Sequence, residues 1–457
     1  MAEVSEICKC TMVSTKGVDV GRFCSLSALD HVMEHNHLRI VLYYSTPKEI
    51  KLGEPTKMLK ESLSQALCAY PIVTGRLLRD PEKGNWMIKS NDAGVRMVEM
   101  RAQGNVEKWL QNVDSEKELK LVYWEHMFTK PYFWSPFYIQ ITEFEEGGLA
   151  IGLSCTHLLS DPISAVMFMK SWAHMTVKGT MPSPLLYRPI KTLRKSDQTS
   201  HGHCHGNLSN GLIEHYKSTL RKPIAAGISE KKLTTVSLAF SDQMVRSCIS
   251  AASSDVLLRP PTPFEALAGL FWTSISKIKG RRENGLIDMS VCLDMRKVLD
   301  LDENFFGNCM VYSKASSDGL GGTNELSEAV AGIEKVVDKM DAKTTMELIE
   351  WLEEATAKHI SPPLMNGLDL ICANLEDVDT YSAIFCPNFK PILASFYIEP
   401  TAGEGSILVL PAPPDAGPFS RIVMITLAED EAIELLKDES IQQFSPKVLM
   451  KMAEKKL

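Results

Sequence analysis

Residues 149–162 read LAIGLSCTHLLSDP, and this short stretch predicts a strand, a tight turn and the beginning of a helix. The apolar run from Leu149 to His157 alternates as in a strand of a buried sheet. Asp161 suits the N-cap of a helix, and Pro162 suits its first position. The stretch therefore predicts a histidine at the end of a buried strand, shortly before an aspartate that begins a helix.

Proton transfer is the chemistry that this turn can support. A neutral imidazole takes a proton from a hydroxyl or an amine near neutral pH, so His157 is placed as a general base. The alternative is structural: His157 is a hydrogen-bonded core histidine and Asp161 a simple helix cap. The spacing alone leaves both interpretations open and favours the structural one, because short motifs recur by chance.

The sequence on both sides continues the mixed pattern of strands and helices. Further apolar strands are predicted at 40–44, 137–144, 406–410 and 421–427. Helices are predicted at 58–70 and after a capping box at 262–265. A polar stretch at 194–210 interrupts the pattern. We therefore predict an α/β protein with two similar-sized domains, 1–190 and 213–457, joined by a long crossover linker at 191–212.

The composition is that of a globular protein with a substantial core, since 44% of the 457 residues are hydrophobic and 23% charged. A net charge of -8 argues against nucleic-acid binding, which usually needs a basic surface. No apolar stretch is long enough to span a bilayer, and the first residues are too polar for a secretory signal. We expect a cytoplasmic protein with no transmembrane segment. The last residues, Lys455-Lys456-Leu457, resemble a peroxisomal S-K-L address only loosely.

The cysteines indicate a reducing compartment. There are 11, an odd number, and none forms a C-x-x-C motif. The only close pair is Cys8 and Cys10.

Two groups of histidines are candidates for metal ligands. Residues 201–205 (HGHCH) have ligand types that zinc accepts, but they are crowded within the polar linker, which favours a solvated loop. His31 and His35 share one face of a helix, with His37 nearby, but no carboxylate or cysteine completes an obvious set. We expect a surface helix there, and no metal site in the protein.

Motifs spread over nearly the whole chain resemble those of the plant BAHD family of acyl-CoA-dependent acyltransferases. The first is the HxxxD motif formed by His157 and Asp161. The others, in the family's order, are Leu26 to Asp30 (LSALD), Tyr70 to Leu77 (YPIVTGRL), Thr262 to Leu267 (TPFEAL), Asp294 to Arg296 (DMR) and Phe306 to Asn308 (FGN). The resemblance implies two chloramphenicol-acetyltransferase-like domains with an active-site channel at their interface. It also implies a monomer with no bound cofactor that uses acyl-CoA as a co-substrate.

The resemblance further implies roles for individual residues. His157 would deprotonate a small alcohol or amine acceptor, which then attacks the acyl-CoA thioester. Asp161 would be structural, with Arg296 as its ion-pair partner. Asp294 belongs to the same supporting motif.

Within the family the sequence is most similar to the eceriferum/glossy subgroup. Like that subgroup it lacks the late DFGWG motif, since residues 385–391 read FCPNFKP. The DMR and FGN motifs, in contrast, look more like those of the catalytic branches. The subgroup is associated with very-long-chain fatty acid elongation for cuticular wax, and some members act without HxxxD. An alternative to acyl transfer is therefore a non-catalytic partner of an elongase condensing enzyme, held at the endoplasmic reticulum by that partner. A third is different chemistry on the same fold, such as that of a lyase.

Overall fold

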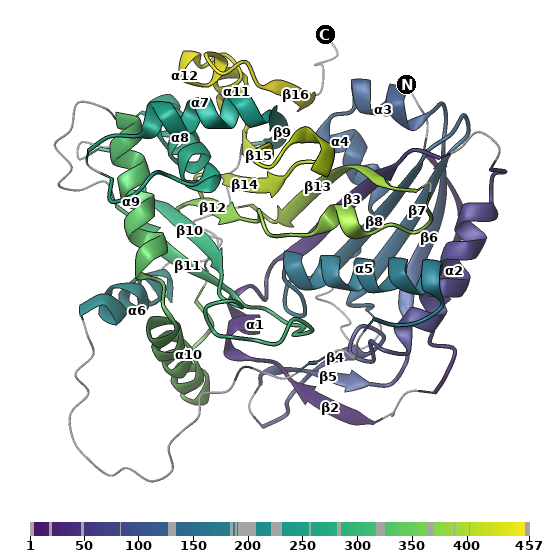
Figure 1. Ribbon diagram of the computed structural model, residues 1–457. Helices are drawn as coiled ribbons and strands as arrows, with labels where there is room; N and C mark the ends of the chain where they lie inside the picture. Colours follow the sequence, from purple (N-terminus) through teal and green to yellow (C-terminus); the bar gives the residue numbers. More distant parts are fainter. Residues whose placement is uncertain are drawn as a thin grey trace.

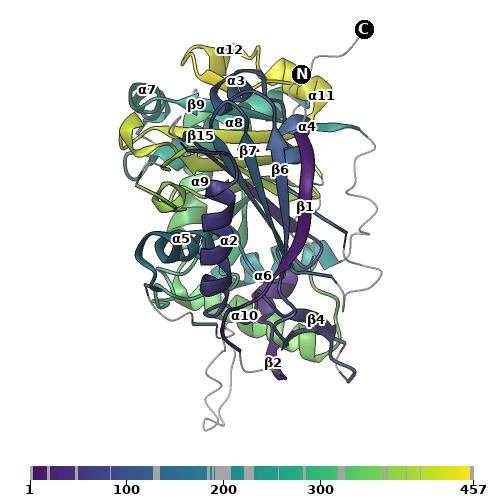
Figure 2. The ribbon, with the colours of Figure 1, turned by 90° about the vertical axis from the view of Figure 1, so that its right-hand side faces the viewer.

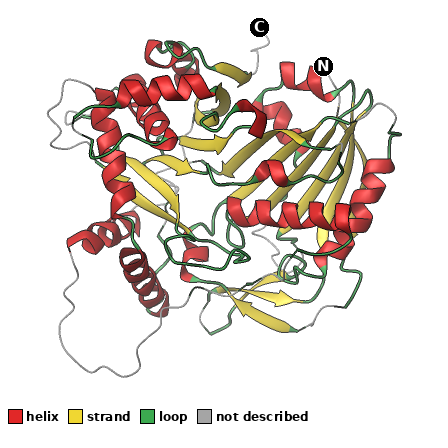
Figure 3. Ribbon diagram, viewed as in Figure 1, coloured by secondary structure: helices red, strands yellow, loops and turns green. Residues whose placement is uncertain are grey.

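The structure is a computed structural model in which strands gather in two large sheets and helices cover them (Figures 1 and 3). It describes residues 4–17, 21–46, 50–82, 84–126, 134–182, 186–187, 190, 207–220, 231–255, 257–280, 285–316, 325–363, 365, 369–387, 389–401 and 403–452.

The first sheet has six strands. In sheet order they are β1 (Val4–Met12), β6 (Val95–Ala102), β7 (Phe137–Phe144), β8 (Leu149–Thr156), β3 (His37–Tyr44) and β13 (Pro391–Glu399). Every residue of β7 and β8 is buried, because helices α2 (Glu54–Leu67) and α5 (Pro162–Lys178) lie against the sheet. Figure 2 shows β1 at the edge of this sheet, with α2 alongside.

The second sheet has seven strands. In sheet order they are β11 (Met310–Ala315), β10 (Met289–Asp294), β12 (Leu370–Asn374), β14 (Ser406–Pro411), β15 (Arg421–Ala428), β9 (Leu233–Phe240) and β16 (Lys447–Met450). The helices that pack around it include α7 (Asp242–Ala252), α8 (Pro263–Ile278) and α9 (Glu325–Lys339). Almost all of α8 is buried, and its N-terminus has the predicted capping box between Thr262 and Glu265.

The remaining elements surround the two sheets. A small sheet contains β2 (Arg22–Ser25), β5 (Trp86–Ser90) and β4 (Arg76–Arg79). The other α-helices are α1 (Ala28–Val32), α3 (Val106–Asn112), α4 (Ser115–Glu118), α6 (Asn207–Leu220), α10 (Ala342–Ala357), α11 (Glu429–Leu435) and α12 (Glu439–Gln442). Short 3-10 turns are η1 (Leu119–Leu121), η3 (Thr380–Ser382) and η4 (Pro414–Ala416). Among the described residues, no helix combines the length and the apolar character that crossing a membrane requires.

The predicted elements are found close to their expected positions. The strand expected at 137–144 is β7, the strand that ends near His157 is β8, and the helix expected at 58–70 corresponds to α2. Helix α6 begins at Asn207, so it occupies the last part of the segment expected to be linker. The rest of that segment, 191–206, lies outside the described residues, as does the Lys455-Lys456-Leu457 end.

Strand β13 joins the two halves of the chain. It comes from the second half, yet it pairs with β3 in the first sheet. Tyr43 of β3 and Ser395 of β13 donate hydrogen bonds of 2.8 and 2.9 Å to Glu118 Oε1, and the Tyr397 hydroxyl donates to Oε2. The Glu118 carboxyl is buried, and this burial raises its pKa. The first sheet is therefore completed by a strand that comes after four of the seven strands of the second sheet in the chain.

Candidate active site

His157 lies where the sequence predicts, directly after the last residue of β8. Its backbone N–H donates to the carbonyl oxygen of Asn36 at 2.9 Å, which fixes the end of β8 to the segment before β3. The side chain is only 1% exposed. Burial lowers the pKa of His157 below its ordinary value, so the imidazole is neutral near pH 7.

Asn308 fixes the orientation of the imidazole. Its Oδ1 lies 2.9 Å from His157 Nδ1. Its Nδ2 donates to Asp30 Oδ1 and to the His157 carbonyl oxygen, both at 2.8 Å. These two bonds identify which end of the amide is nitrogen, so the oxygen faces the imidazole. Because that oxygen only accepts, Nδ1 carries the proton and Nε2 keeps its lone pair.

Asp30 supports Asn308 from the opposite side. It belongs to α1, where Ser27 N–H donates to Asp30 Oδ2 at 2.6 Å in a capping box. Its Oδ1 also accepts from the backbone N–H of Asn308 at 3.1 Å. Asp30, Asn308 and His157 thus form a buried hydrogen-bonded chain, although they are distant in sequence.

Asp161 is not a member of this hydrogen-bonded chain of side chains. It caps a helix and pairs with an arginine. It is fully buried and caps α5, accepting from Ser164 N–H at 2.9 Å. Its Oδ2 lies 2.8 Å from Arg296 Nη2 and accepts from Cys309 N–H at 3.0 Å. Asp294 takes the other end of the guanidinium, with Nη1 to Oδ1 at 2.8 Å. The structure therefore brings Asp161, Arg296 and Asp294 into one ionic group.

This ionic group holds the turn that carries Asn308. Arg296 Nη2 donates to the Gly307 carbonyl oxygen at 2.7 Å, and Ser164 Oγ accepts from Gly307 N–H at 3.0 Å. Gly307 has a φ of 148°, which residues with a Cβ rarely adopt. With Cys309 held by Asp161, both neighbours of Asn308 are anchored to the start of α5. Asp161 therefore acts on His157 through the position of Asn308.

A second charged cluster, partly buried, lies at the beginning of β3 and the end of β13. His37 stacks on Trp124, with ring centroids 4.4 Å apart, and His37 Nε2 lies 3.4 Å from Glu399 Oε2. Arg39 Nε lies 2.9 Å from the same oxygen. Burial lowers the pKa of His37. This cluster places charged side chains at the junction between β3 and β13.

A cavity of about 1090 Å³ adjoins α1 and the small sheet. Ser27 and His31 line it, so it touches the helix that carries Asp30. His157 is not among its lining residues.

The chain matches the model described as the Transferase family over residues 7–373. It belongs to the BAHD transferase family. It is 25% identical to Protein ECERIFERUM 2 of Arabidopsis thaliana over 427 residues, covering 90% of this chain and 92% of that protein. It is 28% identical to rosmarinate synthase of Plectranthus scutellarioides over 442 residues, covering 92% and 96%.

The BAHD fold is also found by comparison with solved structures. The crystal structure of F. sporotrichioides TRI101 complexed with coenzyme A and T-2 matches with a TM-score of 0.67 and 14% sequence identity. The match covers 94% of this chain and 100% of that one. The predicted family and the predicted α/β fold, with two chloramphenicol-acetyltransferase-like domains, are therefore confirmed.

The segment that replaces the BAHD DFGWG motif still forms a turn before β13. Phe389 N–H donates to the Cys386 carbonyl oxygen at 2.8 Å, and the two residues form an isolated bridge. Phe385 is buried between Tyr44 and Trp172, with ring centroids 5.9 and 4.6 Å away. Aromatic packing thus fixes this turn without the glycines of the BAHD motif.

The sequence does not single out two residues of the site. Asp30 and Asn308 enter the sequence analysis only within the LSALD and FGN motifs, and those BAHD motifs are the available signal for them. His31 was expected on a surface helix, which is wrong: α1 is a short buried helix, and His31 is 6% exposed. The HGHCH stretch at 201–205 lies outside the described residues.

Proposed function

We propose that this BAHD protein transfers an acyl group from acyl-CoA to an alcohol or amine, with His157 Nε2 as the general base. One observation carries the proposal: Asn308 Oδ1 accepts from Nδ1 at 2.9 Å and thereby leaves Nε2 unprotonated. The lowered pKa of the buried imidazole keeps it in this form at neutral pH. A base of this kind accelerates a reaction by about 10²–10⁴-fold.

The proposed reaction has two steps. Nε2 of His157 takes the proton of the acceptor hydroxyl or amine as its oxygen or nitrogen attacks the thioester carbonyl carbon. The carbon–sulfur bond then breaks, and the CoA thiolate leaves and recovers the proton from the imidazolium. Asn308 stays hydrogen-bonded to Nδ1 throughout, and its oxygen stabilises the positive charge that forms on the ring.

A non-catalytic role in fatty acid elongation is the second candidate. One observation of the site favours it: His157 is almost fully buried. The loss of the DFGWG residues and the similarity to Protein ECERIFERUM 2 favour it too.

The same variant separates the two candidates in two assays. Purified wild type and His157→Ala are incubated with acyl-CoA and small alcohol or amine acceptors, and released CoA is quantified by chromatography. The acyltransferase proposal expects a loss of at least about 10²-fold in the variant.

The second assay uses yeast that also expresses a plant elongase condensing enzyme. Wild type and His157→Ala are expressed in turn, and the very-long-chain acyl groups are profiled. Longer chains with both versions would establish the accessory role and remove His157 as a catalyst.

A further inference from the structure

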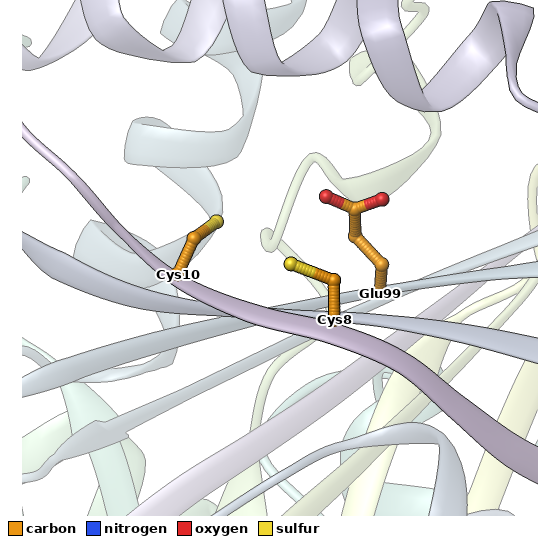
Figure 4. Close-up of side chains that lie close together, drawn as sticks. All are labelled: Cys8, Cys10 and Glu99. Carbon is orange, nitrogen blue, oxygen red and sulfur yellow. The ribbon is translucent and has the colours of Figure 1, made fainter.

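Two thiols and a carboxylate gather at the outer edge of the first sheet. Cys8 and Cys10 alternate along β1, so both side chains lie on one face, and Cys8 is directly opposite Glu99 of β6. Their ligand atoms all lie within 4.8 Å of one another. Figure 4 shows the three side chains rising from the same side of the strands. Strand β7 lies between this cluster, which β1 and β6 carry, and strand β8, which ends directly before His157.

Two neighbours make the cluster suited to a cation. Met12, the next residue on this face of β1, places its sulfur 3.8 Å from Cys10 Sγ, which makes the surroundings rich in sulfur. Lys60 of α2 places Nζ 2.5 Å from Glu99 Oε1 and leaves the other carboxylate oxygen for a second partner. Cys8 is exposed, so an ion can enter from solvent.

We propose that Cys8, Cys10 and Glu99 bind one zinc ion, with a fourth position left for water. Two thiolates and one carboxylate are ligands that zinc accepts, and three protein ligands make an open tetrahedral site. Two thiolates and a carboxylate also balance the charges of Zn²⁺ and the Lys60 ammonium. With zinc–sulfur bonds of about 2.3 Å, the ligand atoms of a tetrahedron lie roughly 3.8 Å apart. Zinc binding therefore requires the three ligand atoms, which lie within 4.8 Å of one another, to move closer together.

The two thiolate ligands make the proposed site selective for zinc over Ca²⁺ and Mg²⁺. Hard cations such as Ca²⁺ and Mg²⁺ prefer oxygen ligands, so they do not compete at a site with two sulfurs. A bound ion would link the edge strand β1 to β6 and stabilise that pairing, because ligands that bind only the folded state raise its stability.

The test is a metal titration of the reduced, full-length protein. Co²⁺ serves as the probe, because cobalt–thiolate bonds absorb in the near ultraviolet, and Zn²⁺ is added to displace it. We expect one Co²⁺ per chain with a thiolate band that Zn²⁺ removes and Ca²⁺ does not. Cys8→Ser and Cys10→Ser should each weaken binding at least about tenfold, and Glu99→Gln should weaken it with the band retained. Cys24→Ser, a half-buried thiol on β2, is the matched control and should bind like wild type.

Two results would overturn the proposal. One is the absence of a thiolate band in the wild-type protein. The other is a band of unchanged intensity and affinity in the Cys8→Ser/Cys10→Ser double variant, which would place the metal elsewhere, for example at the HGHCH stretch. Thermal unfolding gives a second readout: zinc should raise the melting temperature of wild type and of Cys24→Ser, but not that of the double variant.

Discussion

Asn308 Oδ1 accepts a hydrogen bond from His157 Nδ1 at 2.9 Å, although the two residues are 151 positions apart in the chain. The same amide donates to Asp30 and to the His157 carbonyl oxygen, so it cannot turn over without breaking both bonds. The tautomer of the proposed base is therefore determined by a residue that need not touch the substrate.

Replacing Asn308 should lower kcat much more than it changes KM. In Asn308→Ala the imidazole loses the acceptor that selects its tautomer, and we expect kcat to fall by roughly 10²-fold, within the range that a general base contributes. KM should change little. Steady-state kinetics with a fixed acyl-CoA and acceptor measure both. A fall in kcat/KM that arises from KM alone would contradict a positioning role.

The pH dependence of the rate should reflect the burial of His157. Because burial lowers the pKa of His157, kcat/KM should rise with pH, and the midpoint of the rise should lie below the ordinary histidine pKa of about 6.5. A midpoint above that value would argue against His157 as the base. The same shift affects stability. The unfolded chain protonates this histidine more readily than the folded protein, so stability should fall as the pH drops through the unfolded pKa.

Arg296 should be far more important for stability than its neighbour Lys297. In Arg296→Ala the fully buried carboxylate of Asp161 loses its charged partner, which costs about 3–5 kcal/mol of the free energy of unfolding. Lys297 pairs with Asp377 on the surface, so Lys297→Ala should cost at most about 1 kcal/mol. Urea unfolding of the two variants gives the comparison. Equal losses would show that the Asp161 pair is not desolvated as described.

Glu118 should stabilise the pairing of β3 with β13. In Glu118→Leu the hydroxyls of Tyr43, Ser395 and Tyr397 lose their acceptor, and we expect a loss of at least about 3 kcal/mol in the free energy of unfolding, since each of the three unsatisfied buried groups costs about 1–3 kcal/mol. Glu118→Gln keeps an oxygen acceptor and should lose less. Thermal unfolding of both variants tests this order, and a Gln variant that is as unstable as the Leu variant would contradict it.

The sequence predicted the elements better than the contacts between them. The strand–turn–helix around His157 depends on local periodicity and capping, so β8, the Asp161 cap and α5 could all be predicted from adjacent residues. The partner of Asp161 came from the family resemblance, and it lies where that resemblance implied. The pairing of Asn308 with Asp30 carries no local signal, because their hydrogen bond joins residues 278 positions apart.

The error at His31 has a related cause. Helical spacing predicted that His31 and His35 share a face, but α1 ends at Val32, so His35 lies outside it, and spacing does not reveal which neighbours cover so short a helix. The lost DFGWG residues likewise could not reveal that Phe385 packs between Tyr44 and Trp172 and preserves a turn. Both features depend on packing between distant segments, which no single sequence window contains.

The place of β13 in the first sheet has a consequence for synthesis on the ribosome. The partner strand β3 is made early, but the strand that covers its free edge is made only after residue 391. Until then the nascent chain presents unpaired backbone N–H and C=O groups along β3, a template for pairing with other chains. The first half is therefore the part of the nascent protein that most needs protection by chaperones, and it should aggregate when translation stops before β13 emerges.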